Sequence, residues 1–195
     1  MNRRFDGDGG QTLGIYIVAV AALFFLAFAY FAVGQAASIR NTAQTAADAS
    51  ALAAAREVRD SVREPFLDAL EDGDLDGLRD LLDLRGMTPG NACGEAANYA
   101  GQNGAIVDEC VVGGPGGATI ALHTADTVGK SVVPGTESMP AHATATAVVD
   151  SRCSVDDADG DAVTFICDGD RLTVDPTAGD FHLNLADFYF VHLSE

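Results

Sequence analysis

The sequence predicts an α+β protein with a long N-terminal transmembrane helix that continues into an alanine-rich stalk helix, followed by a small disulfide-bearing α+β domain with a mainly antiparallel sheet. Three observations predict this class. Residues 13–33 carry no charge, residues 35–64 are rich in alanine and free of proline, and residues 65–195 contain short helical and strand-like runs and all four cysteines. The predicted organisation is a lead at 1–12, a transmembrane helix at 13–34, a stalk helix at 35–64 and an acidic domain at 65–195, with 150–195 as a candidate added β element.

The uncharged run is long enough to cross a membrane. As a helix, residues 13–33 extend about 31 Å, which matches a hydrocarbon core of about 30 Å. Tyr16 and Tyr30 lie near its two ends, where amphipathic rings prefer the membrane interface. The four phenylalanines of the run point to all sides of the helix: Phe24, Phe25, Phe28 and Phe31. Lipid suits such a surface better than the one-sided core of a soluble domain does.

Basic residues and cysteines predict the orientation. Arg3 and Arg4 precede the span, whereas Arg40 is the first base after it, so the N-terminus is expected in the cytoplasm. The cysteines form an even set beyond the span, which is typical of disulfides in an oxidising compartment. They are Cys93, Cys110, Cys153 and Cys167. We therefore expect a single-pass protein of the cell membrane, with residues 35–195 extracytoplasmic or on the cell surface.

The charge is unevenly distributed along the chain. Residues 1–64 hold equal numbers of acidic and basic side chains, so residues 65–195 carry the whole formal net charge of −18. Such a domain repels nucleic acid and anionic lipid headgroups, which excludes nucleic acid as an expected partner. Solubility alone also accounts for the charge.

The alanine-rich segment is expected to extend the membrane helix to about Arg63, because alanine is the strongest helix former. Pro65, Gly73 and Gly77 are expected to end it. Four alanines spaced by four and three residues form a flat face: Ala43, Ala47, Ala51 and Ala54. A face of small side chains lets a neighbouring helix approach closely, so we interpret it as a packing surface for partner helices. A solvated spacer helix is the alternative.

At this point the sequence resembles a known family. A lead rich in Asp and Gly (DGDGGQT, 6–12), one apolar span and the run QTAADASALAAA (Gln44–Ala55) look like the N-terminal region of TadE-like and TadG-like proteins of the Tad/Flp pilus assembly system. The resemblance covers residues 7–64, and the alanine, glycine and aspartate content suggests an actinobacterial version. It implies a bitopic or pseudopilin-like subunit that acts with a secretion ATPase and membrane platform proteins. It implies no catalytic residue and no cofactor.

Two processing events compete with a permanent anchor. A secretory signal peptide would be cut near Gly34, although its apolar region is normally shorter, about 7–15 residues. Prepilin-type cleavage would follow Gly10, but the fifth residue after that cut is Ile15, where pilin-like precursors usually carry Glu.

Short elements are expected in the outer domain. Leucines at near-helical spacing after Gly73 predict an amphipathic helix, and a second helix is expected to begin at Cys93. Apolar or alternating runs predict strands or strand-like segments at 105–112, 118–128, 141–149, 162–167, 171–174 and 187–193. A helix followed by three strands resembles the small α+β head of TadE-like proteins, which implies a Cys93–Cys110 bridge. Cys153 and Cys167 flank an acidic loop that a local disulfide would close. Four cysteines permit three pairings, and sequence does not choose among them.

The acidic loop also suggests a weak calcium site. Asp157, Asp159, Asp161 and Asp168 stand at the first, third, fifth and twelfth positions of an EF-hand-like count. However, Ala162 replaces the glycine of the sixth position, and the residues after it look like a strand. We therefore predict a solvated loop, and no metal or cofactor.

Other motifs do not predict an enzyme. Gly129-Lys130-Ser131 imitates the end of a phosphate-binding loop but lacks the upstream glycine and a following helix. The histidines lack metal-ligand spacing and are expected to be surface or strand residues: His123, His142, His182 and His192. No HExxH, GxSxG or CxxC motif is present.

We therefore expect a structural or accessory, membrane-anchored subunit of a Tad/Flp-type pilus or secretion assembly. Its expected partners are the membrane and other pilin-like or platform proteins, with homo- or hetero-oligomers formed through the N-terminal helix. A membrane-tethered binding or adhesin-like module is the alternative, and an extracytoplasmic enzyme comes third. Replacing Ala47 and Ala51 with leucine is expected to disrupt assembly in the first case and to leave binding intact in the second.

Overall fold

The computed structural model of the chain describes residues 11–87, 89–114, 116–127 and 138–194, and it has the predicted α+β class. The helices are α1 (Gln11–Asp60), α2 (Arg63–Glu71), α3 (Leu75–Leu82) and α4 (Ala92–Gln102), with a short 3₁₀ helix at Leu185–Asp187. The strands are β1 (Ala105–Gly113), β2 (Gly117–Thr127), β3 (Pro140–Ser151), β4 (Cys153–Asp159), β5 (Ala162–Cys167), β6 (Asp170–Val174) and β7 (Tyr189–Leu193).

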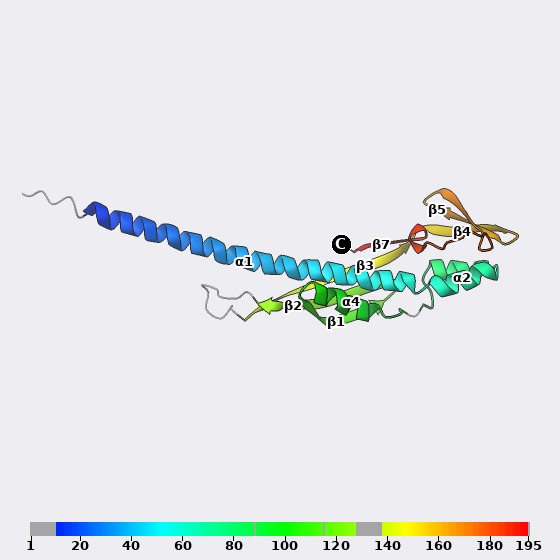
Figure 1. Cartoon of the computed structure of the whole chain (residues 1–195), viewed down its shortest axis with the longest axis horizontal. Helices are drawn as coiled ribbons and strands as arrows, with labels where there is room; N and C mark the ends of the chain where they lie inside the picture. The colour runs from blue at the N-terminus through cyan, green and yellow to red at the C-terminus, as the bar shows by residue number, and fades with distance from the viewer. Residues whose placement is uncertain (1–10, 88, 115, 128–137, 195) are drawn as a thin grey trace, which may run out of the picture.

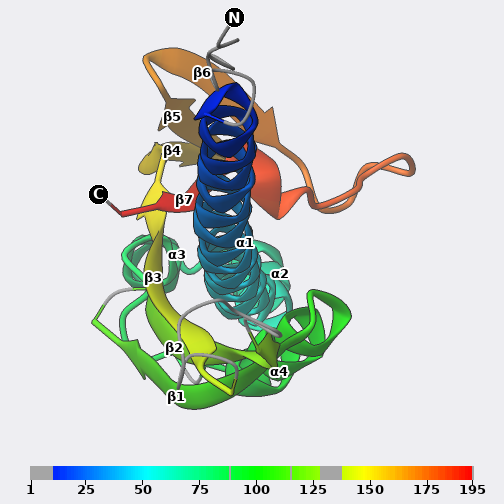
Figure 2. The same ribbon diagram turned by 90° about the vertical axis from the view of Figure 1, so that its left-hand side faces the viewer.

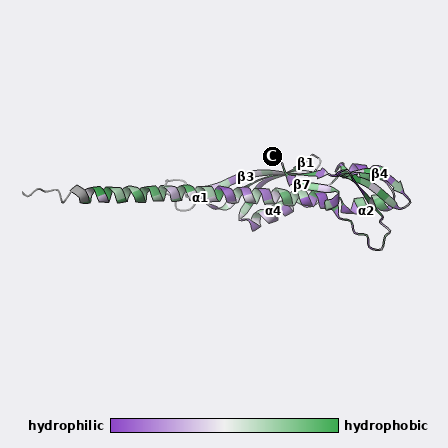
Figure 3. Cartoon of the chain, turned by 90° about the horizontal axis from the view of Figure 1, so that it is seen from above, coloured by the Kyte–Doolittle hydropathy of each residue, from purple (hydrophilic) through white to green (hydrophobic). Residues whose placement is uncertain are grey.

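Helix α1 is the longest element of the described structure and runs from the apolar segment into the folded part. Its 50 residues extend about 75 Å at 1.5 Å per residue. The N-terminal half projects beyond the other elements, and the C-terminal half lies along the sheet (Figure 1). In Figure 3 the projecting half is largely hydrophobic, whereas hydrophilic residues are frequent over the rest of the molecule. A single helix therefore joins the apolar segment to the folded part, as the alanine-rich sequence predicts.

The end of this helix differs in detail from the prediction. Helix α1 stops at Asp60, and α2 resumes at Arg63, so Pro65 lies in the first turn of α2, where its missing N–H is not needed. Gly77 lies inside α3, where its N–H donates to Asp74 Oδ1 at 3.0 Å. The glycine that does mark a break is Gly73, which has a φ of +66°.

A four-stranded antiparallel sheet in the order β1-β2-β3-β7 curves around the C-terminal half of α1 (Figure 2). Helix α4 packs against both α1 and β1. The disulfide Cys93–Cys110 joins α4 to β1, which is the bridge that the resemblance implies. The tail returns to this sheet, because β7 pairs with β3.

The core lies between α1 and the inner face of this sheet. Every second residue of β2 is buried there, namely Ala118, Ile120 and Leu122, as the period-two pattern of a half-buried strand requires. Helix α1 packs against β2 and β3 with a face made almost wholly of small side chains. The close approach of helix and sheet depends on that small size, because protein interiors are close-packed.

A second antiparallel sheet, β4-β5-β6, lies at the opposite end of the molecule from the apolar segment (Figure 1). The residues after Cys153, predicted as a solvated acidic loop, form β4 instead, which pairs antiparallel with β5. The disulfide Cys153–Cys167 connects directly opposed residues of β4 and β5. The prediction of disulfides is therefore confirmed.

Three aromatic rings hold the second sheet to the helices. The ring of Phe66 on α2 lies 4.9 Å from that of Phe188 and 6.1 Å from that of Phe165 on β5, between ring centroids. Phe165 and Phe188 meet edge to face at 5.0 Å. All three side chains are buried. Aromatic pairs in such arrangements contribute about 0.5–1.5 kcal/mol each beyond the area that they bury.

Gly116→Ala is expected to lower the free energy of unfolding by about 2–3 kcal/mol. Gly116 has a φ of +75°, and a Cβ there would lie 2.5 Å from Leu84 Cδ1 and 2.8 Å from Val149 Cβ. Gly114→Ala is the matched control, because Gly114 has a φ of +63° with no atom within 4 Å of the added Cβ. Thermal unfolding of both variants separates the clash from the backbone strain, and equal losses would show that the contact at Gly116 contributes nothing.

Candidate functional site

The exposed half of α1 is the largest apolar surface that the structure describes. From Leu13 to Val33 its large side chains are mostly 48–83% exposed, and Phe25, for example, is 72% exposed. It belongs to the one helix, among the described residues, that is long and apolar enough to cross a membrane. Water is an unfavourable environment for so much contiguous apolar surface, so this segment is the candidate membrane anchor.

A shallow groove runs along one side of this segment. It is lined by Gly14, Ile15, Val18, Ala19 and Ala22. Residues four apart lie on the same face of a helix, and Gly14 and Ala22 are small there, so the backbone is accessible to a neighbouring helix.

The alanine face of the predicted stalk helix, expected to be available to partner helices, is buried inside the chain itself. Ala43, Ala47, Ala51 and Ala54 are all fully buried within the single chain, on the part of α1 that packs against β2, β3 and α4. The interpretation of this face as a surface for partner helices is therefore wrong. The spacer-helix alternative is wrong as well, because one face of α1 between Ala46 and Val58 forms part of the hydrophobic core. The small residues allow a close approach of α1 to a sheet of the same chain, and not to a partner helix.

Ser50→Ala is expected to raise the free energy of unfolding by about 1–2 kcal/mol. The Ser50 hydroxyl is fully buried on the core face of α1 and has no hydrogen-bond partner among the described residues. Ser38→Ala, at an exposed position of the same helix, is the matched control and is expected to gain only the helix-propensity difference of about 0.5 kcal/mol. Thermal unfolding of the two variants measures the difference; equal gains would mean that the buried hydroxyl costs nothing.

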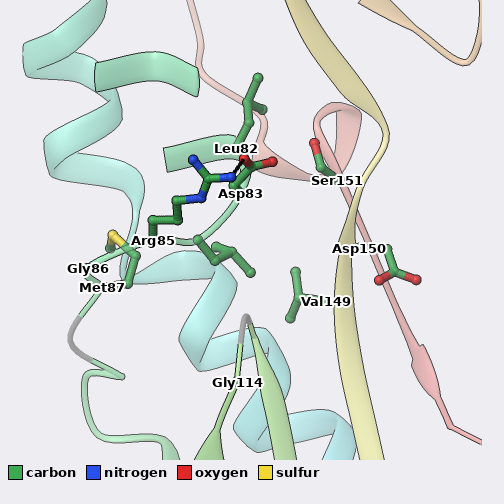
Figure 4. Close-up of a pocket in the computed structure, with 10 residues that line it drawn as sticks. Leu82, Asp83, Arg85, Gly86, Met87, Gly114, Val149, Asp150 and Ser151 are labelled. Atoms are coloured by element: carbon green, nitrogen blue, oxygen red, sulfur yellow. Dashed lines mark ion pairs between the residues drawn. The ribbon is translucent and has the colours of Figure 1, made fainter. Parts of the chain in front are cut away.

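A hollow of about 690 Å³ lies where the α3–α4 connection meets β3 (Figure 4). Arg85 enters it and pairs with the Asp83 carboxylate at 2.9 Å, while Asp150 and Ser151 line its other side. Next to Leu82 of this hollow in sequence, the Leu81 carbonyl accepts a hydrogen bond from Tyr189 Oη at 2.9 Å. Burial and the nearby Asp83 carboxylate raise the pKa of the Tyr189 phenol, so this hydroxyl remains a proton donor in a structural hydrogen bond.

This hollow lacks the relation of nucleophile to base that hydrolysis requires. The Ser151 hydroxyl donates to the Cys153 carbonyl at 2.9 Å and is held there. Arg85 also contacts Asp80 at 3.4 Å, so its charge is shared between two carboxylates of its own chain.

The four aspartates of the weak calcium site do not come together. Asp157 and Asp159 lie on β4 and Asp161 on the turn after it, whereas Asp168 follows β5 at the other end of the hairpin. The six residues of β5 separate the two ends by about 20 Å. Asp168 instead forms an ion pair with Arg152. The EF-hand-like spacing of the four aspartates assumed that the segment is a loop, but the segment forms a β-hairpin.

Two of the histidines do come together, which the sequence analysis missed. His123 on β2 is directly opposite His142 on β3, and their ring centroids are 5.6 Å apart. The Asp108 carboxylate on β1 approaches both, with Oδ1 2.7 Å from His123 Nδ1 and Oδ2 3.6 Å from His142 Nδ1. Ligand atoms of the three residues lie within 4.8 Å of one another. Only strand register could have revealed this cluster, because the histidines are far apart in sequence.

Residues 1–10 of the predicted lead, with Arg3 and Arg4, fall outside the described residues, and so do two further sequence features. These are the prepilin-type cut after Gly10 and the phosphate-loop imitation at 129–131.

Comparison with known proteins connects the apolar segment to a family. Residues 10–57 match the family model described as "Putative Flp pilus-assembly TadE/G-like". The match lies within the N-terminal region and ends inside α1, before α4 and the sheets. The TadE/G-like resemblance of this region is therefore confirmed, and the matching model describes pilus assembly. No curated protein and no solved structure matches the chain.

Proposed function

We propose that this chain, whose N-terminal region is TadE/TadG-like, is a pseudopilin-like structural or accessory subunit of a Tad/Flp-type pilus or secretion assembly and is not an enzyme. The observation that carries the proposal is a single helix with two surfaces. Its first half is apolar and exposed, and its second half is the core of the folded head. Such a helix anchors the protein and holds the head rigidly with respect to the anchor.

In this proposal, residues 1–12 form a cytoplasmic lead, 13–34 cross the membrane, and 35–195 lie outside. The helical rise supports a head that extends away from the membrane, since Val33 and Asp60 are about 40 Å apart along α1. Two disulfides in the head also favour an oxidising compartment.

Protease access in intact spheroplasts tests this orientation. Added protease should remove an epitope tag at Glu195 and spare one at Met1 of the full chain. Loss of the N-terminal tag alone would place the head in the cytoplasm and overturn the topology.

We place partner packing on the exposed half of α1, along the groove at Gly14 and Ala22, instead of on the buried alanine face. Here α1 offers two small residues on one face, and none of the helices and strands that the structure describes covers them. Neighbouring helices of the assembly could pack closely there, and dispersion contacts between backbones would hold them together.

Affinity purification of the detergent-solubilised full chain from its native cell, followed by mass spectrometry, tests the assembly role. A secretion ATPase, platform membrane proteins or small pilins should be recovered with the wild type. Gly14→Leu with Ala22→Leu should reduce that recovery. Ala27→Leu is the matched control, since it lies on the opposite side of the helix at 3.6 residues per turn and is exposed.

The two parts of the proposal fail differently. Recovery of the protein alone, or with an unrelated surface ligand, would overturn the assembly role and favour the membrane-tethered binding module. Equal recovery of the pilus proteins with the Gly14→Leu/Ala22→Leu variant and with Ala27→Leu would support the assembly role, but it would show that the groove is not the packing face.

A further inference from the structure

Asp108, His123 and His142 form a cluster on the outer face of the main sheet, opposite to α1. In β2 the residues facing α1 are Ile120, Leu122 and Thr124, so His123 points to the other side. The antiparallel register places His142 beside it. A β-bulge interrupts the β1–β2 register between Val107 and Glu109, and Asp108 is the extra residue. Bulges re-aim side chains in this way.

The arrangement differs from an ordinary surface ion pair because two histidines converge on one carboxylate. Each oxygen of the single Asp108 carboxylate faces the Nδ1 atom of a different histidine. The pair Asp150–His192, on β3 and β7, has one histidine only, with His192 Nε2 3.7 Å from the carboxylate. Two imidazoles and one carboxylate make a donor set that suits borderline divalent ions, in contrast to the oxygen sets that calcium and magnesium prefer.

The distances are close to those that a metal needs. Zinc–nitrogen and zinc–oxygen bonds of about 2.0–2.2 Å in a tetrahedron separate two ligand atoms by about 3.4 Å. The two N···O distances, 2.7 Å from His123 Nδ1 to Oδ1 and 3.6 Å from His142 Nδ1 to Oδ2, lie on either side of this value. Small rotations of exposed side chains are sufficient to adjust them, because the side chains of Asp108 and His142 are 43% and 69% exposed.

We propose that Asp108, His123 and His142 bind one divalent transition-metal ion, with Zn²⁺ as the first candidate. The three residues supply one nitrogen, one nitrogen and one oxygen, and water takes the remaining position on the solvent side. The site joins three neighbouring strands, so the bound ion stabilises the main sheet by linking β1, β2 and β3. This inference is independent of the proposed pilus role, because it depends on the sheet and not on the N-terminal helix.

The test is zinc binding by the full chain in detergent, purified with a tag that contains no histidine and treated with EDTA before dialysis into metal-free buffer. Isothermal titration with Zn²⁺ should give one saturable site per chain. Co²⁺ at the same site should produce visible ligand-field absorption. Added Zn²⁺ should also raise the thermal midpoint, because a ligand that binds only the native state stabilises it.

Variants assign the site to its residues. Asp108→Asn, His123→Ala and His142→Ala should each weaken Zn²⁺ binding at least about tenfold, since even the loss of a supporting partner costs about 10–100-fold. Each should also abolish the rise in thermal midpoint. His182→Ala is the matched control, an exposed histidine outside the cluster, and should bind Zn²⁺ as the wild type does.

Three results would overturn the proposal. Absence of saturable Zn²⁺ binding by the wild type would show that Asp108 and the histidines form hydrogen bonds only. Binding that persists in all three cluster variants would place the ion elsewhere on the acidic head. Equal weakening in His182→Ala would show non-specific association. Near-ultraviolet circular dichroism identifies any variant that fails to fold, and the remaining two ligand variants then decide.

Discussion

Ala47→Leu combined with Ala51→Leu is expected to lower the free energy of unfolding by about 2–6 kcal/mol, because each added side chain overpacks a closed core at about 1–3 kcal/mol. Both alanines are 0% exposed on the face of α1 that the sheet covers. For a chain of this size the loss corresponds to a fall of roughly 5–20 °C in thermal midpoint. Thermal unfolding of the detergent-solubilised full chain, followed by near-ultraviolet circular dichroism, measures it.

The matched control is Ala37→Leu, at an exposed position of the same helix, which should change the midpoint little. The alanine pair was expected from sequence to disrupt only partner packing. The structure changes that expectation: the double variant should lose stability whether or not partners are present. An unchanged midpoint with lost assembly would instead restore the alanine face as a partner surface and contradict the packing of α1 on its own sheet.

Phe66→Ala is expected to lower the free energy of unfolding by about 3–5 kcal/mol, the usual cost of removing a buried phenylalanine. The Phe66 ring is fully buried, and it contacts Phe188 and Phe165 at the point where α2 meets the second sheet. The cavity left by the substitution would weaken the packing of β4–β6 against α2 more than it weakens the packing of the main sheet. We therefore expect limited proteolysis to cut between 153 and 175 first, together with a fall of roughly 6–20 °C in thermal midpoint.

Phe190→Ala is the control for loss of an aromatic ring. Phe190 is 54% exposed and stacks on His192 with a centroid separation of 5.0 Å. Exposed substitutions of this kind usually change stability by less than about 0.5 kcal/mol. If both variants lost the same stability, the cluster around Phe66 would not be what holds the second sheet in place.

Local sequence patterns predicted many of the elements well. The strands at β1, β2 and β3 lie within a few residues of the predicted runs, because alternation of small or apolar side chains with polar ones depends only on each strand's own two faces. The acidic segment that forms β4 was missed. Its strand character comes from pairing with β5, whose apolar residues reach the core, and not from its own sequence.

Contacts between segments distant in sequence could not be predicted either, because they also depend on which elements pair in the fold. Cys93 and Cys110 are separated by 17 positions in sequence, and only the family resemblance implied that they pair, since four cysteines allow three pairings. His123 and His142 approach Asp108 only because a register and a bulge place them there.

The sequence by itself determined the apolar anchor at 13–33, the long helix that continues from it and the acidic character of the head, because length, hydropathy and charge are properties of the residues alone. The tertiary structure decided what the alanine face of α1 packs against. A row of small side chains fits a neighbouring helix and a curved sheet equally well, since both need only a close approach of backbones. The strands that cover this face lie more than forty residues further along the chain, so only the folded structure shows that they pack there.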